Sequence, residues 1–88
     1  MEFEDYKAYK YIRLATDELR FTEMRLGGKA HCDLVNPGDK VISAGCIGVY
    51  PEYLKIVGVG SISLSVRDSL PGDYWLIEQV IGKKFKKS

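Results

Sequence analysis

The close spacing of turn signals is the feature that most constrains what this chain of 88 residues can fold into. The signals are a glycine pair at 27–28 and the tetrapeptides NPGD, YPEY and LPGD at 36–39, 50–53 and 70–73. In NPGD, proline fixes φ at the second position of the turn and glycine allows a positive φ at the third. The segments between the signals are short, so we expect several short strands joined by turns.

The glycine pair is flanked on both sides by alternating polar and apolar side chains. This period of two is typical of a half-buried strand. A three-residue loop, GGK at 27–29, brings the two apolar rows together, whereas a two-residue loop does not. We therefore expect a hairpin with a glycine in the left-handed conformation. Its pairs are Leu26 with Ala30, Met24 with Cys32 and Thr22 with Leu34.

Three more strands are predicted further along the chain, at 40–50, 54–60 and 61–68. Gly45 and Gly48 interrupt the first of them, which indicates a bulge or a sharp bend of the kind that curves a barrel. The last of them alternates cleanly, with Ile62, Leu64 and Val66 on one face. LPGD is interpreted as the same turn as NPGD used a second time, and it leads into YWLIEQVIG at 74–82.

Two assignments compete for the first 20 residues. A stripe of apolar residues at steps of four, three and four favours an amphipathic helix, and it consists of Ala8, Ile12, Ala15 and Leu19. Three tyrosines between positions 6 and 11 instead favour a strand over about 6–14, followed by a short helical turn. The helix is the assignment that we carry forward.

These patterns together predict one α+β domain over residues 1–82. An N-terminal helix packs on a small, strongly bent, mostly antiparallel β-barrel, and residues 83–88 form a basic C-terminal tail. A chain of this length makes one domain with one small core. A hydrophobic content of 45% with 28% charged residues is that of a globular chain rather than a disordered one.

The charge is distributed unevenly along the chain. The net charge is +1, but KKFKKS at 83–88 carries four lysines, so the rest of the chain is slightly acidic. A protein that grips a long nucleic acid usually has a basic face on its folded body, and none is visible in this sequence. We interpret the tail as a frayed, solubilising end, since disorder concentrates at termini. The alternative is an electrostatic arm for phosphates.

The residues able to bind a soft metal do not form a metal-binding pattern. They are His31, Cys32, Asp33 and Cys46, with no CxxC and no second histidine, so we expect neither a metal nor a cofactor. Both cysteines are interpreted as small buried hydrophobes and the histidine as a polar surface residue. With no signal peptide and no apolar run of about 18 residues, we expect a soluble, cytoplasmic chain with reduced thiols and no membrane association.

The strongest candidate site is the charged stretch that contains Arg20, Glu23 and Arg25. It precedes the glycine pair and then VNPGDKVIS at 35–43. This order resembles the ASCH domain of the PUA-like superfamily, whose signature GxKxxExR is followed by a GD turn and a hydrophobic strand. Arg20 stands at the lysine position of that signature, while Glu23 and Arg25 match it, and Glu18 stands where the family has its glycine. LKIVGVGSISLSVRDSL at 54–70 is similar to a later strand of the family.

The resemblance implies two activities. PUA-like barrels commonly bind RNA, and some ASCH proteins are amidohydrolases that act on acetylated cytidine nucleosides through a KxxT pair. Arg20 and Glu23 occupy those two positions here, and an arginine is always protonated and cannot act as the base. An RNA- or nucleotide-binding module is therefore our leading interpretation, with hydrolysis as a second alternative. The first alternative is a protein-interaction or inhibitor module, because tyrosine and tryptophan are enriched at interfaces.

Three further residues complete the predicted ligand-binding set. Lys29 follows the glycine pair beside the charged stretch. Tyr74 and Trp75, with Tyr50 and Tyr53, are candidates for a base-stacking platform. Large aromatic side chains also dominate the burial of small domains, so Tyr74 and Trp75 have an alternative role at the core and its rim.

Overall fold

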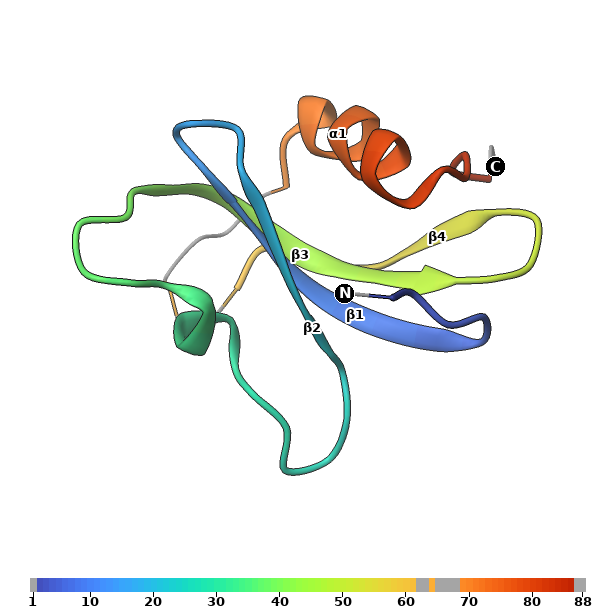
Figure 1. Ribbon diagram of the computed structural model, residues 1–88, viewed down its shortest axis with the longest axis horizontal. Coiled ribbons are helices and arrows are strands. Elements are labelled where there is room, and N and C mark those ends of the chain that lie inside the picture. The colour runs from blue at the N-terminus through green and yellow to red at the C-terminus, as the bar shows by residue number, and fades with distance from the viewer. Residues whose placement is uncertain (1, 62–63, 65–68, 87–88) are drawn as a thin grey trace.

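The computed structural model describes residues 2–61, 64 and 69–86, which contain four antiparallel strands, a short 3₁₀ helix and a C-terminal α-helix (Figure 1). The strands form one sheet in the order β2-β1-β3-β4. In chain order the elements are β1 (Lys7–Leu14), β2 (Leu19–Glu23), the short 3₁₀ helix η1 (His31–Leu34), β3 (Val41–Val49), β4 (Leu54–Val59) and α1 (Pro71–Ile81). The α+β class is confirmed.

The expected N-terminal helix is wrong, and the alternative strand over about 6–14 is confirmed. Strand β1 lies inside the sheet, so it buries side chains on both faces: Tyr9 and Tyr11 on one, Ile12 and Leu14 on the other. A strand buried on both faces has no clean alternation of polar and apolar residues, and its apolar positions can match a helical stripe by chance. The α-helix of the described chain, α1, lies near the C-terminal end.

The predicted hairpin around GGK is also wrong. Strand β2 pairs with β1, with Phe21 opposite Tyr11, and it ends at Glu23. The row that packs against the core is Leu19 and Phe21, while Met24 lies exposed beyond the strand. Residues 31–34 form η1 instead of a second strand. Polar and apolar residues do alternate along β2, but the row that faces the core is Leu19 and Phe21, and not the predicted row of Thr22, Met24 and Leu26.

The turns and strands after η1 follow the sequence pattern. In NPGD, the Asp39 nitrogen donates to the Asn36 carbonyl at 3.0 Å and Gly38 has φ of 88°, so this turn is confirmed. YPEY joins β3 to β4, with a 3.0 Å bond from the Tyr50 nitrogen to the Tyr53 carbonyl. The bulge or bend expected from Gly45 and Gly48 is a bulge between Cys46 and Ile47, where the register with β4 shifts.

LPGD is not a second turn between strands but the start of α1. Leu70 is the N-cap, Pro71 lies in the first turn, and the Asp73 side chain accepts a hydrogen bond from the Leu70 nitrogen at 2.9 Å. A proline at the first helical position costs no hydrogen bond, because that N–H has no partner within the helix. Gly82, with φ of 84°, ends the helix. The strand predicted at 61–68 lies largely outside the described residues.

The two faces of the sheet carry different layers. Helix α1 packs on the face of Tyr9, Tyr11 and Ile47, above the sheet in Figure 1. The opposite face holds Ile12 and Ala44 under partly buried side chains from η1 and its neighbourhood. Strands β2 and β4 are the edges of the sheet in the described chain, so these strands form an open sheet rather than a closed barrel. The described helices lack the length and apolar character that a membrane crossing needs.

Candidate functional site

Arg20 is engaged by three acceptors. Its guanidinium donates to Glu18 Oε2 at 2.7 Å, to the Leu34 carbonyl at 2.8 Å and to Asp39 Oδ2 at 2.5 Å. The Arg20 hydrogen bond, helped by the Asn36 backbone N–H, holds the pKa of Asp39 below its usual value. These contacts tie β2 to η1 and to the NPGD turn, so the guanidinium has a structural role in this state.

The other charged residues of the predicted set do not join Arg20. Glu23 is three positions further along β2, which puts it on the opposite face of the strand, and it lies 3.1 Å from Lys7 Nζ. Arg25 and Lys29 are exposed in the loop after β2, where the Lys29 carbonyl accepts from Lys10 Nζ at 2.9 Å. The structure therefore spreads these four residues over two faces and a loop.

The four predicted aromatic residues divide into two pairs. Tyr74 is half-buried on α1, with its ring edge-on to Phe85 at 5.1 Å between centroids. Its neighbour Trp75 is 61% exposed on the same helix. Tyr50 and Tyr53 stack on each other at the β3–β4 turn. The single platform expected from all four is replaced by a pair at the turn.

His31 and Cys46 form a buried contact that the sequence pattern did not show. His31 Nε2 lies 2.8 Å from the Gly45 carbonyl and 3.9 Å from Cys46 Sγ. His31 is buried, so its assignment to the surface is wrong; Cys46 is buried as expected, whereas Cys32 is exposed. Burial raises the pKa of the Cys46 thiol, which is the opposite of the activation that a nucleophile needs. The described residues contain no cluster of three or more metal-ligating side chains.

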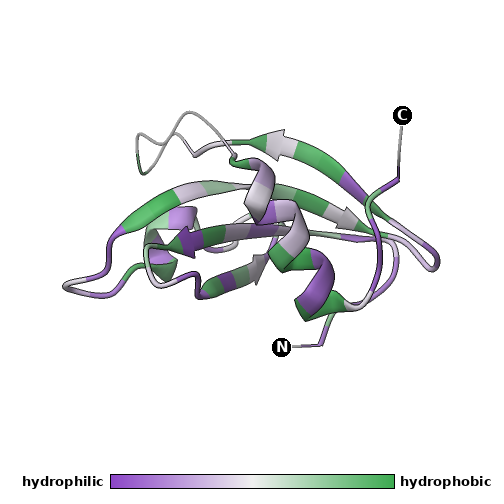
Figure 2. Cartoon of the chain, turned by 90° about the horizontal axis from the view of Figure 1, so that it is seen from above, coloured by the Kyte–Doolittle hydropathy of each residue, from purple (hydrophilic) through white to green (hydrophobic). Residues whose placement is uncertain are grey.

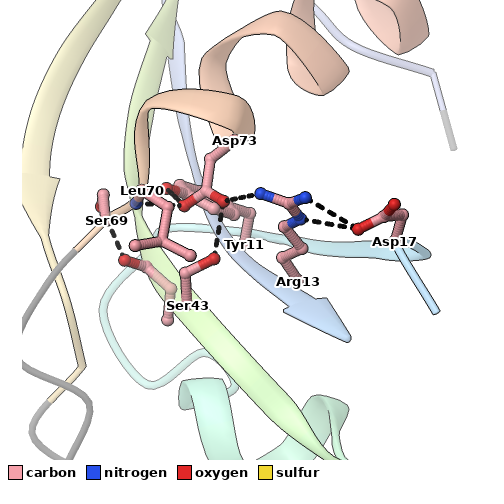
Figure 3. Close-up of polar contacts among 8 residues, drawn as sticks. Tyr11, Arg13, Asp17, Ser43, Ser69, Leu70 and Asp73 are labelled. Carbon is pink, nitrogen blue, oxygen red and sulfur yellow. Dashed lines mark hydrogen bonds and ion pairs between the residues drawn. The ribbon is translucent and has the colours of Figure 1, made fainter. Parts of the chain in front are cut away.

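A fully buried carboxylate, Asp73, joins α1 to the sheet (Figure 3). Its Oδ1 accepts from Ser43 Oγ at 2.6 Å and from Arg13 Nη1 at 3.1 Å. Its Oδ2 accepts from the Tyr11 hydroxyl at 2.8 Å and from the Leu70 nitrogen at 2.9 Å. Four donors thus surround one carboxylate at the first turn of the helix, where the helix dipole also favours negative charge.

The Asp73 network has the properties of a structural joint. Burial raises the pKa of the Tyr11 hydroxyl, so this group stays protonated as a donor. Arg13 continues outward to Asp17, with Nη2 at 2.7 Å from Oδ1. No buried side-chain nitrogen or oxygen in the described chain lacks a partner, so the buried groups of this network are satisfied within the protein. Sequence reasoning missed it, although a proline and an acidic residue two positions later are a known signal for a helix start.

The pair at the β3–β4 turn belongs to a larger aromatic cluster of Tyr6, Tyr50 and Tyr53, which we call the tyrosine platform. The Tyr50 and Tyr53 rings stack with centroids 4.8 Å apart and an interplanar angle of 13°. The Tyr6 ring stands edge-on to Tyr50 at 5.9 Å, and Tyr6 is 76% exposed. Its members come from the turn before β1 and from the β3–β4 turn, which lie at the same end of the sheet in Figure 1. The platform therefore presents aromatic surface at one end of the molecule.

The C-terminal segment 83–86, which we call the basic arm, docks beside this platform. Its backbone exchanges two hydrogen bonds with Leu54: the Leu54 nitrogen donates to the Lys84 carbonyl at 2.8 Å, and the Lys86 nitrogen donates to the Leu54 carbonyl at 2.9 Å. The Phe85 nitrogen donates to Glu78 Oε2 at 2.7 Å. These residues are ordered against β4 and α1, so the interpretation of the segment as a frayed end is wrong for 83–86.

The basic arm brings two ammonium groups to the tyrosine platform. Lys86 Nζ lies over the Tyr53 ring, 5.2 Å from its centroid. Lys83 Nζ donates to the Tyr50 carbonyl at 2.8 Å and to Asp5 Oδ1 at 2.5 Å, which links the arm to the segments that carry Tyr50 and Tyr6. Aromatic surface and positive charge therefore meet at one place.

No protein-family model, no curated protein and no solved structure matches this chain in comparisons of sequence and fold.

Proposed function

We propose that this protein is a small module that binds single-stranded RNA or nucleotides on the tyrosine platform. One observation carries the proposal: the stacked pair Tyr50–Tyr53 lies under the ammonium of Lys86. Proteins that bind single strands combine aromatic rings, on which bases stack, with positive charge that follows the phosphates. The cytoplasmic location expected from the sequence is part of the same proposal.

The ligand class expected from the sequence is retained, but its site is moved. Arg20 donates to three acceptors and Glu23 points to the other face of β2. In the platform, Tyr6 is 76% exposed, and Tyr50 and Tyr53 are half-buried. Aromatic stacking is tolerant of sequence, because every base has a π-face. The charge of the whole chain is only +1, so the affinity for a long duplex is expected to be low. A short single strand is the ligand that fits these properties.

The proposal is tested by titrating the native protein with a short oligoadenylate at low salt. Tyr53→Leu is expected to weaken binding by about 5- to 150-fold, since stacking contributes roughly 1–3 kcal/mol per base. The matched control is Trp75→Leu, which removes an exposed aromatic ring of α1 outside the platform and is expected to change the affinity by less than about twofold. A native protein that binds no oligonucleotide at low salt would overturn the proposal, and so would equal losses in the two variants.

A protein-interaction module is a second candidate, favoured by the outer part of β4. Ile56, Val57 and Val59 are 44%, 51% and 61% exposed, and apolar colour covers most of the strand in Figure 2. Exposed apolar side chains in a row are more typical of an interface than of an isolated domain. A pull-down tests this function. A protein partner that stays bound to the native protein after nuclease treatment, and that the Val59→Lys variant no longer captures, would favour it over nucleic-acid binding. Hydrolysis remains an expectation of the resemblance, and Arg20 in its ion pair with Asp39 lends it no support.

A further inference from the structure

The Tyr53 ring has two close neighbours, the Tyr50 ring and the Lys86 ammonium. Tyr50 stacks nearly parallel on it, 4.8 Å away, and a ring at that distance fills one face. The Lys86 ammonium also lies over the ring, at 5.2 Å from the centroid. A base that stacks on Tyr53 at the position of the ammonium group must therefore displace it.

The Lys86 side chain can move without its backbone. Its nitrogen is bonded to the Leu54 carbonyl, and the ring of its neighbour Phe85 packs against Tyr74. The side chain itself is exposed and reaches Tyr53 through a flexible four-carbon stem. Displacement therefore costs the cation–π contact and leaves the basic arm in place.

The other two lysines of the described arm have carboxylate partners. Lys83 Nζ donates to Asp5, and Lys84 Nζ lies 3.8 Å from Glu78 Oε1. The contact described for the Lys86 ammonium is with an aromatic ring. A displaced Lys86 ammonium remains within side-chain reach of a base stacked on Tyr53, and so of a phosphate attached to that nucleotide.

Resting on the proposed function, we propose that Lys86 makes the tyrosine platform selective for phosphate-bearing nucleotides over neutral nucleosides. Any base that stacks on Tyr53 at the position of the ammonium group loses the contact between Lys86 and the ring. A nucleotide restores an interaction to the displaced ammonium through its phosphate, whereas a nucleoside has no phosphate and restores nothing. Exposed cation–π contacts correspond to a factor of about two to five in an equilibrium constant. The Lys86 ammonium thus lowers the affinity for neutral nucleosides and raises the affinity for nucleotides that carry a phosphate.

The test compares adenosine with adenosine 5′-monophosphate, titrated by NMR into the native protein and Lys86→Gln. The variant is expected to bind adenosine about two- to fivefold more tightly and the monophosphate more weakly than the native protein. Lys84→Gln is the matched control, because it removes the same charge from a lysine paired with Glu78. It is expected to leave adenosine binding unchanged. With a short oligoadenylate, Lys86→Gln is expected to reduce the salt slope by about 0.7, the value for one phosphate contact on a single strand.

The outcomes separate this inference from the function on which it rests. Opposite changes for the two ligands in Lys86→Gln support it. A native protein that binds oligoadenylate, together with a Lys86→Gln variant that shifts both ligands in the same direction or neither, overturns the inference and leaves the function standing. A native protein that binds none of the three probes overturns both. The Lys86 side-chain proton resonances give a ligand-free check, since Tyr53→Leu is expected to abolish their upfield ring-current shift.

Discussion

The hydroxyl of Tyr11 donates a hydrogen bond of 2.8 Å to Oδ2 of Asp73, although the two residues are 62 positions apart in the chain. The bond joins β1, one of the two inner strands of the sheet, to the first turn of α1. Ser43 and Arg13 donate to the other oxygen of the same carboxylate. One side chain therefore fixes the position of α1 over β1 and β3.

Asp73→Ala is expected to lower the free energy of unfolding by about 3–5 kcal/mol, the typical cost of removing one partner of a buried pair. This is a large share of a total that is roughly 5–15 kcal/mol for small domains. The substitution leaves the Tyr11 and Ser43 hydroxyls without their acceptor in the interior. Urea unfolding followed by circular dichroism measures the change.

Asp17→Ala is the control for this prediction. Asp17 accepts from the same Arg13, but its side chain is 59% exposed, and exposed ion pairs contribute only about 0–1 kcal/mol. A loss for Asp17→Ala as large as that for Asp73→Ala would contradict the assignment of this stabilisation to the buried carboxylate.

Two glycines of the β3–β4 pair are expected to respond differently to the same substitution. A Cβ at Gly45 would lie 2.7 Å from Ser69 Oγ, 2.9 Å from the Gly58 carbonyl and 2.9 Å from the Tyr11 ring. At Gly58 the nearest atom is Cys46 Cβ at 3.7 Å, which is an ordinary contact. Gly45→Ala is therefore expected to destabilise the domain by about 1–3 kcal/mol, the usual cost of overpacking, and Gly58→Ala by less than about 1 kcal/mol. Thermal unfolding of the two variants checks the order, and a reversed order contradicts the packing described here.

The sequence predicted the later half of the sheet well, because its signals are local. The NPGD and YPEY turns and the strands at β3 and β4 depend on φ preferences and alternation within a few residues. The start of the chain was assigned wrongly because β1 is covered on both faces, a tertiary property that removes alternation. The hairpin failed for a related reason: β2 found its partner in the preceding strand.

The candidate site was less predictable than the fold. Arg20 was a candidate because it is a charged residue in a motif-like stretch. In the structure its guanidinium is paired with Asp39, 19 residues away, so its role is structural. The tyrosine platform combines residue 6 with 50 and 53, and its lysine comes from position 86. No spacing rule links positions so far apart. The sequence predicted four aromatic candidates, Tyr50, Tyr53, Tyr74 and Trp75. The structure stacks Tyr50 on Tyr53 and leaves Tyr74 and Trp75 on α1, outside the platform.

The thiol of Cys46 is expected to react slowly with a disulfide reagent at neutral to mildly alkaline pH. Burial raises its pKa above the usual 9.0, so the thiolate fraction is lower than that of an exposed cysteine. The neighbouring His31 ring nitrogen contacts the Gly45 carbonyl at 2.8 Å, closer than its 3.9 Å contact with the thiol. Kinetics are measured in a Cys32→Ala variant, where Cys46 is the only thiol. Addition of urea is expected to raise the rate to that of a free peptide thiol, and a fast reaction in the native state would identify Cys46 as an activated nucleophile instead.

The ion pair of Arg20 and Asp39 is expected to make stability depend on pH in the acid range. Arg20 lowers the pKa of Asp39 in the folded protein, so the unfolded state binds a proton to this group more readily. By linkage, the contribution of the pair is fully present above the usual value of 3.8 and is lost as the pH falls through the lower folded pKa. Asp39→Asn should therefore be less stable than the native protein at neutral pH, and the difference in Tm should shrink below about pH 4.

Glu52→Gln, at the exposed turn between β3 and β4, is the control, and its Tm should follow that of the native protein at every pH. A difference for Asp39→Asn that stays constant into strong acid would mean that Asp39 acts only as a cap for the Asn36 nitrogen, to which it is also bonded at 2.7 Å, and not through its charge.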